Sequence, residues 1–276
     1  MRVSGFTFVR NGVLLDYPFE GSIRSLLPLV DELIVNVPES DDDTLARVKA
    51  IGDRKLQVFK SDWDNRLRKG GLILSQQTNR ALERCSGDIA FYLQADEVLH
   101  EEDYPAIRAA MRFYADRDEV DGLSFRFIHF EGGYSTVNPF RYRRQVRVIR
   151  NDGKIRSAGD ACGFERTDAR KFRVQNVKAR VFHYGWVRPP ERMHRKNREL
   201  EKLYHDDEYI ERKYTGKEKH DFRNLAACVT FRGSHPEIMR ERIERADWQL
   251  EAPSRLPLAL RPRAWRMLLK KWGIWR

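Results

Sequence analysis

The sequence predicts an α/β protein with a mostly parallel sheet, followed by a half of mixed β structure and by C-terminal helices. Strand-like apolar runs alternate with helix-like segments over residues 1–100, which is the pattern of a parallel sheet with crossover helices. From Gly122 onward strand-like runs dominate, and charged helices follow them. Of the 276 residues, 41% are hydrophobic, which is enough to bury a core and excludes a wholly disordered chain.

Four apolar runs are expected to form the parallel strands, and a polar loop follows each of them. These runs are residues 3–9, 33–37, 56–59 and 89–93. Apolar residues at helical spacing predict the intervening helices, which are expected through residues 23–29, 45–51 and 76–83. Ligands of open sheets of this kind bind beyond the carboxyl ends of the strands, so the four loops should surround one pocket.

The second half of the chain is expected to be of mixed β structure. Its strand-like runs are residues 122–129, 145–150 and 177–183. Prolines are expected to open charged helices over residues 189–209 and 236–248. Neither an internal repeat nor a long linker interrupts this pattern, which predicts one domain over residues 1–250 and a basic, amphipathic tail over residues 251–276.

Positive charge is concentrated in the tail. The chain carries 52 Lys and Arg against 41 Asp and Glu, and residues 255–276 contain seven of these cations and no acidic residue. Trp and Leu recur there at three- and four-residue steps, so a helix would gather them on one face. Such a helix suits an anionic membrane surface, and it equally suits docking of its tryptophan face on the domain core. Nucleic-acid binding is not expected, because the surplus charge does not follow a groove.

Hydropathy and cysteine spacing bound the location of the protein. No run approaches the roughly 18 apolar residues of a membrane-spanning helix, and the apolar stretch before Arg10 is too short for a secretory signal. A cytoplasmic protein is therefore expected, with the tail allowing peripheral attachment to the inner face of the membrane. Cys85, Cys162 and Cys228 lie too far apart for a metal knuckle and are expected to be free thiols.

Asp96 and Glu97 directly follow the apolar run 89–93. Carboxylates are costly to place in a cleft unless a cation or a proton offsets their charge, so the pair predicts a ligand site or a helix cap. The capping alternative would place Asp96 before a helix over residues 101–111. His183 ends a later strand and is a candidate metal ligand, although an isolated histidine is more often a hydrogen-bonded core residue. One carboxylate, one imidazole and diphosphate oxygens would suit Mn²⁺ or Mg²⁺.

Seven short motifs occur in a fixed order along residues 3–200. They are FVRN, VNVPESDDDT, QQTNRAL, FYLQADEVLHEED, YRRQVRVIRN, SAGDACGFE and VFHYGWV. Their order resembles that of GT-A-fold glycosyltransferases of the family-2 type. The resemblance implies a GT-A-like, Rossmann-like nucleotide-binding sheet with an acceptor-side second half. It also implies a UDP- or GDP-linked sugar as donor and a divalent cation, Mn²⁺ or Mg²⁺, on an Asp-x-Asp motif.

The resemblance implies roles for individual residues as well. Gln94 stands at the first position of the Asp-x-Asp motif, so Asp96 and His183 are left to hold the cation, while Gln94 would bond the ribose or the donor sugar. The residues expected around the nucleotide are Arg10, Glu39, Gln76 and Asn79, and those expected to neutralise the leaving diphosphate are Arg188 and Lys196. The base that deprotonates the acceptor hydroxyl is expected to be Asp160 or Glu165.

The implied reaction transfers a sugar to an acceptor hydroxyl with inversion at the anomeric carbon. The basic tail suggests a saccharide or lipid-linked saccharide acceptor, in the synthesis of a surface polysaccharide or glycolipid. Two other classes stay open. One is a non-catalytic nucleotide- or nucleic-acid-binding module, in which Gln94 marks a lost acidic pair. The other is a nucleotidyltransferase, which would carry a glycine-rich loop after its first strand, where FVRNGVLL has one glycine.

Overall fold

A large mixed sheet forms the centre of the protein. The computed structural model describes residues 1–222, 225, 227–248, 250 and 265. Within this part the sheet has the order β12-β7-β6-β8-β4-β1-β2-β3, and β11 joins it by pairing with β5 and β6. Its strands are β1 (Val3–Phe8), β2 (Glu32–Pro38), β3 (Leu56–Ser61), β4 (Ile89–Tyr92), β5 (Glu97–Leu99), β6 (Gly122–Glu131), β7 (Thr136–Val137), β8 (Arg144–Arg150), β11 (Val174–Trp186) and β12 (Val229–Thr230). A separate two-stranded sheet consists of β9 (Ile155–Ala158) and β10 (Gly163–Arg166).

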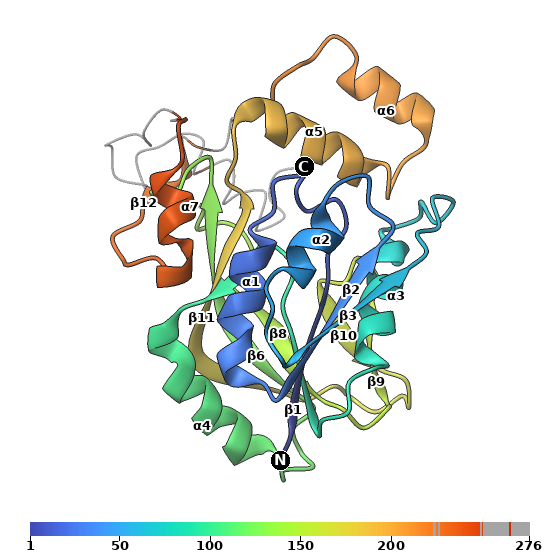
Figure 1. Ribbon diagram of the computed structural model, residues 1–276, viewed down its shortest axis with the longest axis vertical. Helices are drawn as coiled ribbons and strands as arrows, with labels where there is room; N and C mark the ends of the chain where they lie inside the picture. Colours follow the sequence, from blue (N-terminus) through green and yellow to red (C-terminus); the bar gives the residue numbers. More distant parts are fainter. Residues whose placement is uncertain (223–224, 226, 249, 251–264, 266–276) are drawn as a thin grey trace.

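The expected parallel part of the sheet is confirmed, because β4, β1, β2 and β3 are parallel neighbours. Helices α1 (Phe19–Leu26) and α2 (Thr44–Lys49) cover one face, and α3 (Leu72–Leu82) covers the other (Figure 1). Alternate residues of β2 serve the two faces: Leu33 packs in the cluster that contains α1, whereas Ile34 packs with α3. Because both faces are covered, these strands consist of nearly continuous apolar residues.

The second half adds the expected mixed β structure. Strand β8 lies between β4 and β6 and runs antiparallel to both. Strand β11 runs parallel to β6 and antiparallel to β5, while α4 (Tyr104–Tyr114) packs against it. This register sets His183 of β11 opposite Glu97 on one side and opposite His129 on the other. Polar residues from strands far apart in sequence thus meet at one place.

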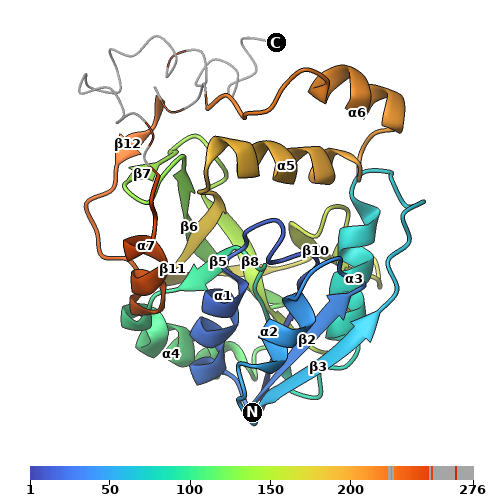
Figure 2. The ribbon, with the colours of Figure 1, turned by 45° about the horizontal axis from the view of Figure 1, so that its top comes forward.

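The helix expected over residues 189–209 is instead two helices, α5 (Pro190–Glu201) and α6 (Asp207–Tyr214). The break has a local cause. The Asp206 carboxylate accepts a hydrogen bond from the Tyr209 N–H at 2.8 Å and so caps a new helix. Helix α5 lies across the end of the sheet, over β8, with α6 beyond it (Figure 2).

The C-terminal part differs from expectation in length. The helix expected over residues 236–248 consists of a 3₁₀ turn, Glu237–Met239, and the short α7, Arg240–Glu244. Apart from Trp265, the tail over residues 251–276 lies outside the described residues. Among the described residues, no helix is long and apolar enough to cross a membrane.

Glu97 and Arg147 form a fully buried ion pair between β5 and β8. Two guanidinium N–H groups donate to the two carboxylate oxygens at 2.6 and 2.7 Å, and neither side chain is exposed to solvent. The carboxylate also accepts from the Gln94 N–H at 3.2 Å, and Arg147 also donates to the Cys162 carbonyl at 3.2 Å. The pair therefore ties the loop after β4 to the loop between β9 and β10.

We predict that Glu97→Ala destabilises the protein by about 3–5 kcal/mol, because Arg147 would stay buried without its counter-charge. The matched control is Glu165→Ala, which removes a carboxylate from the exposed pair with Arg156 and should cost about 1 kcal/mol or less. Urea unfolding followed by circular dichroism measures both changes. Losses of equal size in the two variants would contradict the role given to the buried pair.

Candidate active site

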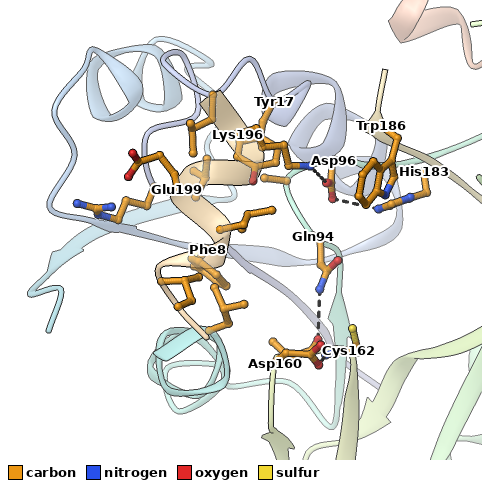
Figure 3. Close-up of a pocket in the computed structure, with 18 of the residues that line it drawn as sticks. Phe8, Tyr17, Gln94, Asp96, Asp160, Cys162, His183, Trp186, Lys196 and Glu199 are labelled. Atoms are coloured by element: carbon orange, nitrogen blue, oxygen red, sulfur yellow. Dashed lines mark hydrogen bonds and ion pairs between the residues drawn. The ribbon is translucent and has the colours of Figure 1, made fainter. Parts of the chain in front are cut away.

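A cavity of about 420 Å³ lies at the carboxyl ends of β1 and β4. Figure 3 shows 18 of its lining residues as sticks. The loops after β1, β3 and β4 and helix α5 contribute the lining residues Arg10, Leu15, Tyr17, Trp63, Gln94, Ala95, Asp96, Lys196, Glu199 and Leu200, among others. Three of the four loops expected to surround one pocket therefore line this cavity. The loop after β2 contributes no lining residue.

Asp96 is the buried carboxylate of this cavity, with 8% of the residue exposed. Its Oδ2 lies 3.4 Å from Lys196 Nζ and its Oδ1 lies 3.7 Å from His183 Nε2 (Figure 3). Burial alone would raise the pKa of Asp96, but the neighbouring charges of Lys196 and Arg188 lower it overall, so the carboxylate is ionised at neutral pH. The capping alternative is wrong, because His100 caps the 3₁₀ turn that precedes α4.

A chain of hydrogen bonds fixes the tautomer of His183. His129 Nε2 lies 2.8 Å from the carbonyl of Tyr142, which can only accept, so this nitrogen carries a hydrogen. Burial lowers the pKa of His129 to about 4 and that of His183 to about 3, so both rings are neutral near pH 7. Their Nδ1 atoms lie 3.0 Å apart, and His183 must donate because Nδ1 of His129 bears a lone pair. His183 Nε2 therefore presents a lone pair to Asp96.

Asp96 Oδ1 and His183 Nε2, which are both Lewis bases, thus face each other with no proton between them. Gly185 keeps the adjoining space open: a methyl group added there would lie 2.7 Å from Asp96 Oδ2 and 2.8 Å from His183 Nε2. An ionised carboxylate and a neutral imidazole together form a donor set that suits Mn²⁺ and, less well, Mg²⁺. The two residues fit the expected cation, and its other ligands would come from substrate or water. No group of three or more His, Cys, Asp or Glu in the described part of the chain could hold a metal by itself.

Lys196 and Arg188 bring positive charge to Asp96 from the segment that follows β11. The Lys196 ammonium donates to the Gly185 carbonyl at 2.6 Å, in addition to its contact with Asp96. Burial and the charge of Arg188 lower the pKa of Lys196 to about 7, although Asp96 acts to raise it. Arg188 is fully buried, donates to the same carbonyl at 3.0 Å, and is not among the residues that line the cavity.

Arg10 and Trp63 form another part of the cavity wall. The Arg10 guanidinium lies 4.6 Å from the centre of the Trp63 ring and donates to the Glu39 carbonyl at 2.8 Å. The Glu39 side chain is exposed and does not line the cavity. The Arg10 side chain therefore lies at the cavity where the nucleotide was expected. Glu39 holds Arg10 through its backbone carbonyl.

Two expected nucleotide residues on α3 lie elsewhere. Gln76 is exposed and does not line the cavity. Asn79 accepts from the Ser157 N–H at 2.8 Å and donates to the Ser157 carbonyl at 3.0 Å, so it fastens α3 to β9. Between them, Gln77 is fully buried and bonds Asn36 at the end of β2. The side chains of Gln77 and Asn79 therefore bond neighbouring strands of the protein and do not face the cavity.

Gln94 and Asp160 lie on the side of the cavity opposite Lys196 (Figure 3). The Gln94 amide donates to the Ala161 carbonyl at 3.3 Å, and Asp160 accepts from the Cys162 N–H at 3.2 Å. Ala161 has φ 61°, a left-handed conformation that is uncommon for a residue with a Cβ and is found at functional sites. Burial, together with Asp160, raises the pKa of the Cys162 thiol to about 12.

Glu165, the other expected base, is not among the residues that line the cavity. It lies on β10, where its carboxylate accepts from Arg156 at 2.9 and 3.0 Å and is half exposed. Of the two carboxylates in SAGDACGFE, only Asp160 borders the cavity.

Many lining residues were not predicted from the sequence, among them Tyr17, His129, Arg141 and Trp186. One of them carried a usable signal. His129 ends an expected strand as His183 does, and polar residues at strand ends were the basis for the other predictions. Arg141 stacks over the Trp186 ring at 4.1 Å, a contact between segments that no local pattern relates.

Comparisons with known proteins place this chain beside several solved structures. No protein-family model and no curated protein sequence matches it. Staphylococcus aureus TarS shares 18% identity at a TM-score of 0.43, over 72% of this chain and 39% of that one. TarS 1–349 in complex with UDP shares 17% identity at a TM-score of 0.43, over 78% of this chain and 70% of that one. Glucosyl-3-phosphoglycerate synthase from Mycobacterium tuberculosis, in complex with Mn²⁺ and UDP-glucose, shares 23% identity at a TM-score of 0.32, over 47% of this chain and 44% of that one. All three TM-scores lie below 0.5.

We predict that Gly185→Ala abolishes Mn²⁺ binding, because the added methyl group would occupy the space beside Asp96 Oδ2 and His183 Nε2. Gly133→Ala is the matched control, since a methyl group there meets nothing within 4 Å. Titration calorimetry with MnCl₂ and a nucleoside diphosphate measures binding, and thermal unfolding shows whether each variant is folded. Unchanged Mn²⁺ affinity in a folded Gly185→Ala protein would exclude this cation site.

Proposed function

We propose that the chain is a GT-A-type glycosyltransferase that moves a sugar from a UDP- or GDP-linked donor to an acceptor hydroxyl. The observation that carries the proposal is the buried Asp96 carboxylate facing the unprotonated Nε2 of His183, in a cavity at the carboxyl ends of parallel strands. A site of this charge and shape suits a diphosphate held through a divalent cation. Bound there by Asp96 and His183, Mn²⁺ or Mg²⁺ would supply positive charge to the leaving diphosphate.

The chain's own side chains support the two needs of this reaction. Arg188 and the protonated form of Lys196 provide positive charge beside Asp96, which would stabilise the negative charge that develops on a leaving diphosphate. The Arg10–Trp63 pair provides a flat surface against which a nucleotide base can stack. Gln94 presents a neutral amide, which suits hydroxyl groups of ribose or of the donor sugar.

Asp160 is the proposed general base. An acceptor hydroxyl must lose its proton as it attacks the anomeric carbon, and a carboxylate bordering the cavity can accept that proton. Attack from the face opposite the diphosphate inverts the anomeric carbon. Cys162 fixes the carboxylate through its N–H, and the Glu97–Arg147 pair holds the Cys162 carbonyl.

We predict that Asp160→Asn lowers kcat for sugar transfer by about 10²–10⁴-fold, because an amide cannot accept the proton. Donor binding should be unchanged. Glu165→Gln is the matched control and should retain its rate, since Glu165 lies outside the cavity. A panel of UDP- and GDP-sugars, assayed with Mn²⁺, with Mg²⁺ and with chelator, identifies the donor and the cation together. Nucleotide binding without any turnover of the panel would favour a non-catalytic module instead.

The proposal includes a saccharide or lipid-linked saccharide acceptor at a membrane. The basic tail over residues 251–276 is the reason for this part of the proposal. We predict that the full chain sediments with vesicles containing anionic phospholipid and that a chain ending at residue 250 does so much less. Neutral phosphatidylcholine vesicles are the control. Equal sedimentation of the two chains would remove the membrane part of the proposal and leave the transferase part intact.

A further inference from the structure

A second cavity, of about 700 Å³, lies along the loop between β7 and β8. Strand β6, that loop and strand β12 contribute to its walls. Its lining includes the arginines Arg126, Arg141, Arg143, Arg144 and Arg232. Among the described residues that line it there is no aspartate or glutamate. We name this cavity the arginine groove.

Most of this charge is not compensated within the groove. Arg126, Arg143 and Arg232 are exposed, and among the residues that the structure describes none of the three forms an ion pair. Arg141 differs, because it donates to the Glu131 carboxylate at 3.0 and 3.2 Å. Like charges gathered in this way repel one another, and an anion bound between them would remove that cost.

Arg144 adds a positioned charge to the floor of the groove. It is half-buried and donates to the Ser124 carbonyl at 2.5 Å and to the Val177 carbonyl at 2.9 Å, both of them neutral acceptors. Burial lowers the pKa of Arg144, and the charge of Arg126 lowers it further. The guanidinium is therefore held in place without a counter-charge.

The arginine groove meets the candidate active site. His129, Arg141 and Tyr142 line both cavities. His129 contacts His183 directly through the two Nδ1 atoms, and His183 faces Asp96. The arginine groove and the candidate active site therefore adjoin each other along these three residues.

We propose that the arginine groove binds the acceptor, and that this acceptor is a saccharide carrying phosphate or carboxylate groups. The inference rests on the proposed function and names the class of acceptor. Guanidinium groups bind phosphate and carboxylate through paired N–H donors. Phe127, Ile128 and Pro139 add apolar contact to the same groove. A single-stranded nucleic acid would also meet the charge, but a groove that adjoins the candidate active site favours a chain whose hydroxyl group can reach that site.

The test measures binding of three probes to the full chain in the absence of nucleotide: an oligogalacturonate, a phosphorylated dextran and an unmodified dextran of similar length. We expect at least one anionic probe to bind about tenfold or more tightly than the neutral one, and its identity distinguishes carboxylate from phosphate. The Arg126→Gln/Arg143→Gln double variant should weaken that binding about tenfold. Arg54→Gln/Arg112→Gln removes the same charge from exposed arginines outside the groove and should change it less than twofold.

Three outcomes would overturn the inference: equal binding of neutral and anionic probes, equal weakening by the two double variants, or tighter groove-dependent binding of a 20-nucleotide single-stranded DNA. Thermal unfolding of each variant shows that it is folded. The proposed function is tested separately, by UDP and GDP binding with Mn²⁺ and by the sugar panel. Failure there leaves the probe binding interpretable, and failure of the probes leaves the donor assay interpretable.

Discussion

The buried pair of Glu97 and Arg147 is the constraint on which the geometry of the site depends. Two charges without solvent contact must be matched atom by atom, and here the match extends to Gln94 on one side and Cys162 on the other. The first contact fixes the loop that carries Asp96, and the second fixes the loop that carries Asp160. The loop after β4 of the large sheet and the separate β9–β10 hairpin thereby hold their carboxylates at a common cavity.

The burial of Asp96 accounts for the positively charged residues that the segment from β11 to α5 brings to the cavity. A carboxylate at this depth requires positive charge, and one continuous segment supplies it, with Arg188 in the turn after β11 and Lys196 on α5. Gly185 lies in the same segment, and its carbonyl accepts from both Arg188 and Lys196. The Gly185 carbonyl oxygen therefore orients both Arg188 and Lys196. Helix α5 is held against the cavity by the same contacts.

The sequence predicted those parts of the fold and the site that depend on local patterns. Alternation of apolar runs and helices identified the parallel strands, and polar residues at strand ends identified Asp96 and His183, which the register of β11 against β5 brings together. Glu39, Gln76 and Asn79 were placed by motif order alone, and the tertiary contacts of α3 and of the loop after β2 direct them elsewhere. Glu165 and Asp160 differ by five positions in sequence, yet the hairpin of β9 and β10 places only Asp160 at the cavity. No local pattern in the sequence shows that Arg126 and Arg143 line one groove.

The substitution of Gln94 for the first acidic residue of the motif is consistent with the charges around it. With one carboxylate instead of two, Asp96 faces Lys196 at 3.4 Å and also lies within the influence of Arg188, so positive charge exceeds negative charge around this carboxylate. A second carboxylate would neutralise that surplus and would also need a partner of its own at a position where the Gln94 amide bonds the Ala161 carbonyl. A nucleoside diphosphate would bring negative charge to Lys196 and Arg188. If Asp96 holds a divalent cation as proposed, it does so beside these two positive residues instead of beside a second carboxylate, and the neutral Gln94 amide leaves their charge in place.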